Sequence, residues 1–164
     1  MRRLILGVII AVLVAAMPIA AISADTIVTC KNPAGYGNYH YAGIVSKEKS
    51  GFTDDKITGG LFTLVRVNKK EYDILFVDVR QTIISHMQDG GAVRLLRKGK
   101  DDATFLVFYP GMLIELYTFY RDASGSEHFD ILQSKGGDKM HVHKSTLMTG
   151  NCSGLNLNLL HNPD

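Results

Sequence analysis

Short runs of apolar and polar residues in alternation, separated by turn-forming residues, make up most of the chain after residue 24. Residues 60–68 (GLFTLVRVN) and 71–79 (EYDILFVDV) are two such runs, joined by a short polar turn. Successive side chains of a β-strand point to opposite faces, so this period of two predicts strands. In residues 71–79 both faces carry apolar side chains, which predicts a strand that is covered on both sides.

Seven further runs of this kind span residues 26–29, 39–45, 92–97, 103–109, 112–121, 126–134 and 139–148. Together with the first two, they predict roughly eight strands in succession. Residues 31–38 contain one proline and two glycines and are expected to form a loop. Consecutive strands with such short connections pair antiparallel. The pattern therefore predicts one all-β domain over residues 25–164, an antiparallel meander that closes as a small barrel or half-barrel, with a β-sandwich as the alternative.

Residues 80–88 are the one segment with a helical pattern. Ile83, Ile84 and Met87 fall at helical spacing, and a pair of glycines at positions 90 and 91 ends the segment. We expect one short helix here, of one or two turns, at the end of the barrel.

The first 24 residues differ in composition from the rest of the chain. Two arginines precede an apolar run (residues 4–17), a proline and several small residues. This is the order of a secretory signal peptide, and the small residues favour cleavage after Ser23 or Ala24. An uncleaved membrane anchor is the alternative, because residues 4–22 approach the ~20 residues that span a bilayer. With cleavage, we expect a periplasmic or secreted protein without stable membrane insertion.

The net charge of the remaining chain argues against electrostatic partners. Arg2 and Arg3 are two of 18 basic residues, so the other 16 balance the 16 acidic residues. A neutral domain lacks the basic surface that nucleic acids or anionic membranes attract. We therefore expect no nucleic-acid partner.

Two cysteines stand near the ends of the predicted domain. Cys30 and Cys152 are 122 positions apart, and an exported protein keeps them in an oxidising compartment. No Cys-x-x-Cys motif points to redox chemistry. We predict a structural disulfide, which requires the first and last parts of the domain to be adjacent.

Histidines offer one candidate for metal chemistry. His141 and His143 would share a face if residues 139–148 formed a strand, and His128 could supply a third ligand. The alternative is a solvated strand face, because Lys139 and Lys144 flank the pair and oppose cation binding.

Aromatic residues offer candidates for ligand binding. Tyr36, Tyr39 and Tyr41 lie close together among glycines and could form a flat platform, or could pack onto the barrel end. Tyr117 and Phe119 belong to a second group of aromatic residues that includes Phe105. Residues 103–109 of this group are apolar on both faces of the predicted strand, so one face could line an internal cavity or meet a partner. A fully packed core is the alternative.

The chain carries no Gly-x-Ser-x-Gly, His-Glu-x-x-His or phosphate-binding loop. We therefore expect a non-catalytic binding domain without a cofactor, which recognises either a protein, as an inhibitor does, or a small apolar ligand. Two alternatives remain: a hydrolytic or metal-dependent enzyme that uses His141 and His143, and a structural envelope protein without a ligand. A carrier needs an apolar void of several hundred Å³, whereas an inhibitor needs only an exposed patch.

The signal-peptide prediction is tested by the intact mass of the exported protein. The mass should correspond to a chain that lacks the residues up to Ser23 or Ala24. A full-length mass would instead support the membrane anchor.

Overall fold

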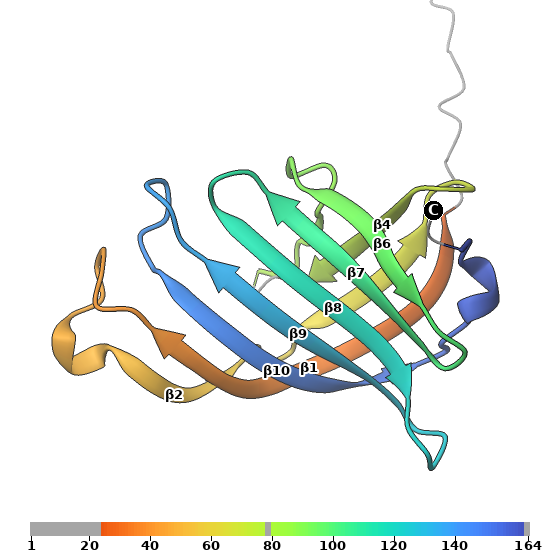
Figure 1. Cartoon of the computed structure of the whole chain (residues 1–164), viewed down its shortest axis with the longest axis horizontal. Helices are drawn as coiled ribbons and strands as arrows, with labels where there is room; N and C mark the ends of the chain where they lie inside the picture. Colours follow the sequence, from red (N-terminus) through yellow and green to blue (C-terminus); the bar gives the residue numbers. More distant parts are fainter. Residues whose placement is uncertain (1–23, 78–79, 163–164) are drawn as a thin grey trace, which may run out of the picture.

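The computed structural model describes residues 24–77 and 80–162. It confirms the all-β prediction, because ten strands form one antiparallel sheet that curls strongly into a half-barrel (Figure 1). The predicted signal peptide lies outside the described residues, apart from Ala24.

The sheet places the first and last strands of the chain side by side. Its strands run in the order β5-β4-β3-β1-β10-β9-β8-β7-β6, and β2 pairs with β1 outside this path. The strands are β1 (Asp25–Tyr39), β2 (Gly51–Lys56), β3 (Leu61–Arg66), β4 (Tyr72–Val77), β5 (Ile83–Ser85), β6 (Ala92–Lys98), β7 (Asp102–Tyr109), β8 (Leu113–Arg121), β9 (Glu127–Lys135) and β10 (Lys144–Ser153). Two short 3-10 helices, η1 (Lys47–Lys49) and η2 (Leu157–Leu159), complete the described elements.

The predicted disulfide is confirmed. Cys30 on β1 lies directly opposite Cys152 on β10, and the two form a disulfide across the ladder. Cys30 is fully buried. The bond therefore ties together two strands that are already neighbours in the centre of the sheet.

Strand β1 corrects the prediction of a loop over residues 31–38. The strand continues through this segment, with a register shift between Lys31 and Ala34. Before the shift β1 pairs with β3, and after it β1 pairs with β2. Gly35 is needed because a Cβ there would lie 2.0 Å from the carbonyl oxygen of Leu147 on β10. Proline and glycine thus mark a bulge and a close strand contact, and not a loop.

The strand ends also differ from two of the predicted runs. β1 ends at Tyr39, so residues 40–45 are not the strand that was expected there. At the other end of the chain, β10 begins only at Lys144, and residues 139–143 form a loop.

The prediction of a helix over residues 80–88 is wrong. Ile83 and Ile84 belong to β5 and pair with the end of β4, and Gln81 has a positive φ of 62°. β-Branched side chains favour this pairing over a helix of two turns. The turn after β5 is held by Asp73, which accepts from the Ser85 hydroxyl at 2.5 Å and from the Met87 amide at 3.2 Å.

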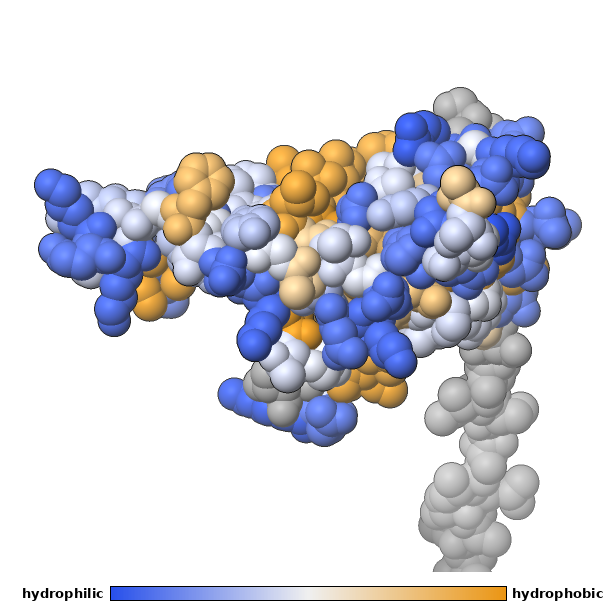
Figure 2. Space-filling model, turned by 90° about the horizontal axis from the view of Figure 1, so that it is seen from below, coloured by the Kyte–Doolittle hydropathy of each residue, from blue (hydrophilic) through white to orange (hydrophobic). Residues whose placement is uncertain are grey.

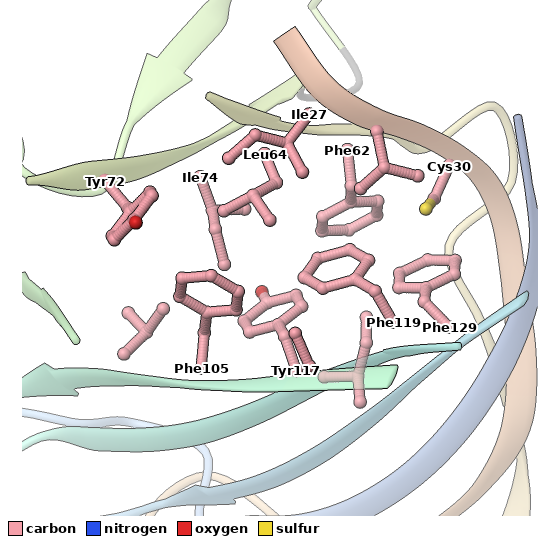
Figure 3. Close-up of a cluster of buried hydrophobic side chains, with 14 of the residues drawn as sticks. Ile27, Cys30, Phe62, Leu64, Tyr72, Ile74, Phe105, Tyr117, Phe119 and Phe129 are labelled. Atoms are coloured by element: carbon pink, nitrogen blue, oxygen red, sulfur yellow. The ribbon is translucent and has the colours of Figure 1, made fainter. Parts of the chain in front are cut away.

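The core occupies one end of the half-barrel. Aromatic rings from β7, β8 and β9 pack against side chains from β1, β3 and β4 (Figure 3). The largest fully buried side chains are Tyr72, Tyr117, Phe105, Phe119 and Phe129. The rings of Phe119 and Phe129 are stacked with centroids 6.1 Å apart, and Phe129 also meets Phe62 at 5.5 Å. Each buried ring contributes about 3 kcal/mol or more to the free energy of unfolding.

The residues after β10 close this end of the half-barrel. This C-terminal plug (residues 154–162) includes η2 and lies at the end of the curled sheet (Figure 1). Its leucines pack against the core, and Leu160 is buried. Lys98 on β6 donates to the carbonyl of Leu160 at 2.8 Å, and the amide of His161 donates to the hydroxyl of Tyr72 on β4 at 2.9 Å. The plug therefore bridges the two sides of the curled sheet.

Removal of the disulfide tests its contribution to stability. The double substitution Cys30→Ala and Cys152→Ala should lower the free energy of unfolding by about 2–5 kcal/mol, because the bond closes a loop of 122 residues in the unfolded chain. Urea denaturation measures the change. An unchanged midpoint would show that the β1–β10 ladder holds the ends together unaided.

Candidate functional site

A cavity of about 500 Å³ lies on the concave face, next to the packed core. Alternation along the strands builds its wall: Leu113, Glu115 and Tyr117 point inward from β8, and Ile131 and Gln133 point inward from β9. Most of the remaining wall is apolar. Its apolar side chains include Phe62, Phe76, Met112, Met140 and Met148.

Glu115 is a buried carboxylate on this apolar wall. The hydroxyl of Tyr117 donates to its Oε2 at 3.0 Å, and the amide of Gln133 donates to its Oε1 at 2.6 Å. Glu115 as a whole is 5% exposed. A carboxylate oxygen can accept two hydrogen bonds, and each oxygen of Glu115 receives one of these two, so each keeps one acceptor position.

His86 comes from the turn after β5 and lines the cavity beside Glu115. Its Nδ1 lies 2.9 Å from the hydroxyl of Tyr109, which in turn lies within reach of the His86 carbonyl and of Asp89. In the tautomer that carries its proton on Nδ1, Nδ1 donates to the Tyr109 hydroxyl, which donates to one of those two oxygens. In this tautomer Nε2 is an acceptor. It is buried, has no hydrogen-bond partner, and lies 3.9 Å from Oε2 of Glu115.

The ionisable groups of the cavity are shifted by burial. Burial lowers the pKa of His86, although the nearby carboxylates of Glu115, Asp73 and Asp89 oppose the shift. Burial, followed by the charge of Glu115, raises the pKa of Tyr117. The imidazole and the phenol are therefore neutral at pH 7.

One cation lies in the cavity wall, and it is already paired. Lys144 Nζ lies 2.7 Å from Oδ2 of Asp55 on β2 and 5.2 Å from the centre of the Tyr39 ring. Burial acts to lower the pKa of Lys144, but the hydrogen bond and charge of Asp55 outweigh it and raise the pKa. Lys144 thus stays charged and is neutralised by Asp55.

The aromatic residues singled out in the sequence are separated by the fold. Tyr117 lines the cavity, whereas Phe119 is fully buried in the core. Tyr39 contacts Lys144 and Asp55, while Tyr36 and Tyr41 are 64% and 70% exposed. Tyr36 and Tyr39 are an odd number of positions apart on β1, so they face opposite sides of the sheet and form no common platform.

The histidines predicted as metal ligands are also not brought together. His141 and His143 lie in the loop before β10, and His143 Nε2 bonds to the carbonyl of Met140 at 3.0 Å. His128 lies near the start of β9 and pairs with Asp122 at 3.1 Å. Within residues 24–77 and 80–162, no group of three or more His, Cys, Asp or Glu side chains is arranged to hold a metal ion.

The outer face of the sheet also carries apolar side chains. Leu132 on β9 and Leu147 on β10 are directly opposite each other and are 47% and 53% exposed. Seen from below, hydrophobic residues gather in the middle of the molecule, between hydrophilic ends (Figure 2).

Sequence reasoning missed His86, Glu115 and Gln133. Glu115 could have been recognised from the sequence, because it falls on the same face of its strand as Tyr117 and Phe119. A charged residue on an otherwise apolar face indicates a buried polar site. His86 had no such signal, because its position depends on the turn that replaces the expected helix.

No protein-family model, curated protein or solved structure matches the chain. Among the described residues, no helix is both long and apolar enough to cross a bilayer.

The neutral state of His86 is tested by the pH dependence of stability. Because burial lowers its pKa in the folded state, the unfolded chain binds the proton more readily, and the stability that neutral His86 provides is lost as pH falls below about 6.5. The difference in free energy of unfolding between the wild type and His86→Gln should therefore shrink from pH 7.5 to pH 5 in urea denaturation. His141→Gln, in an exposed loop, is the control. A difference that grows in acid would mean that folded His86 is charged.

Proposed function

We propose that this protein binds a small, mainly apolar ligand inside the half-barrel. The observation that supports this proposal is the cavity of about 500 Å³, whose wall is apolar except for a few grouped polar side chains. Binding sites for small molecules have this character: concave, mostly apolar, and with few oriented polar groups.

The size of the cavity suits a small organic molecule. At the ~30 Å³ that a water molecule occupies in the liquid, it holds roughly 15 non-hydrogen atoms. A protein that docks through its surface needs no such void, so the cavity favours a carrier over an inhibitor.

The rigid frame supports the same proposal. The disulfide and the plug stabilise the closed end of the half-barrel, while the cavity wall uses several methionines. Methionine adapts its shape to different apolar partners. The disulfide also suits an oxidising compartment, so we place the protein in the periplasm or outside the cell.

A fluorescence titration with N-phenyl-1-naphthylamine tests the proposal. This neutral apolar probe brightens when it leaves water, and we expect saturable binding at one site per chain. The absence of saturable binding by this probe would overturn the proposal.

A matched pair of substitutions locates the site. Leu113 lines the cavity and its neighbour Ile114 is 47% exposed on the outer face. Leu113→Trp should fill part of the void and weaken probe binding about tenfold or more, whereas Ile114→Trp should leave it within about twofold of the wild type. Equal effects of the two substitutions would place the probe elsewhere.

A further inference from the structure

The charged groups of the cavity are mainly acidic. Glu115 and Asp89 both line it, and the cationic side chain in its described wall, Lys144, is already neutralised by Asp55. His86 is neutral, so it does not balance Glu115. A ligand that enters the cavity therefore meets uncompensated negative charge.

The floor of the cavity also has unused hydrogen-bond acceptors. The side chains of His86 and Glu115 are 5% and 6% exposed, so water gives them little compensation. Nε2 of His86 has no partner, and Oε2 of Glu115 has one acceptor position left beside Tyr117. Burying such groups without partners is costly, and a single group with two hydrogens to donate would satisfy both when His86 carries its proton on Nδ1.

We propose that the cavity selects ligands in which a protonated amine ends an apolar body, with Glu115 and His86 as its acceptors. This inference rests on the proposed function. Nε2 and Oε2 are 3.9 Å apart, so a ligand nitrogen beside the line that joins them can lie about 2.9 Å from both, which is hydrogen-bond distance. The ammonium also supplies the positive charge that balances the Glu115 carboxylate.

The surrounding rings suit a cation as well. Phe76 and Tyr117 lie next to the imidazole, with ring centres 5.1 and 6.0 Å from it. Aromatic faces attract ammonium groups, most strongly where water is excluded. A carboxylate head would be repelled by Glu115, and a hydroxyl has only one hydrogen to donate to two acceptors.

Three ligands of equal chain length test the selectivity. Decylamine, 1-decanol and decanoate are titrated at pH 7.5 against the wild-type protein loaded with N-phenyl-1-naphthylamine. We expect decylamine to displace the probe with at least about tenfold higher affinity than either of the others. Equal affinities, or a preference for decanoate, would overturn the amine inference and leave the proposed function standing. If the probe itself fails to bind, the proposed function fails instead.

A matched pair of variants tests the assigned residue. Glu115→Gln keeps the shape of the side chain and removes its charge, and it should weaken the binding of decylamine about tenfold or more relative to that of 1-decanol. Glu48→Gln makes the same change on η1, outside the cavity wall, and should alter neither. An unchanged decylamine affinity in Glu115→Gln would overturn the assignment. Should that variant fail to fold, the wild-type ligand series still decides the inference.

Discussion

The pairing of β1 with β10, fixed by the Cys30–Cys152 bond, is the constraint on which the rest of the structure depends. It joins two meanders, one running from β1 through β3 to β5 and the other from β6 to β10, into a single sheet. Each meander alone would expose an apolar face, and only their union allows the sheet to curl and cover it. Both the packed end and the hollow end exist because this central ladder is formed.

Side-chain volume explains why one end is filled and the other is open. Along β9, Phe129 fills the core, whereas Gln133 faces the cavity with a smaller, polar side chain. Along β10, Gly150 leaves room for the Phe129 ring, because a Cβ there would lie 2.4 Å from it. The same strands thus support a rigid core and a cavity whose polar groups meet at Glu115. The core that stabilises the fold and the cavity that is proposed to bind a ligand therefore lie at different ends of the same strands.

The sequence predicts the parts of this fold that depend on local alternation. The strands from β7 to β9, and β3 with β4, follow from period-two runs, and the disulfide is predicted from the number of cysteines and the expectation of export. The long β1 could not be recognised, because its proline and glycines serve a bulge and a close contact with β10 that only tertiary pairing creates. The cavity has no local signal either, since His86 and Glu115 meet through the curl of the sheet and not through any motif.

Because the plug is synthesised last among the described elements, the half-barrel can close only late in synthesis. β1 leaves the ribosome before its partner β10 and the plug, which are synthesised more than a hundred positions later. The central ladder is therefore a contact of high sequence separation, which is slow to form. Until synthesis reaches the plug, apolar surface of the strands that precede it stays exposed, and such surface is prone to aggregation.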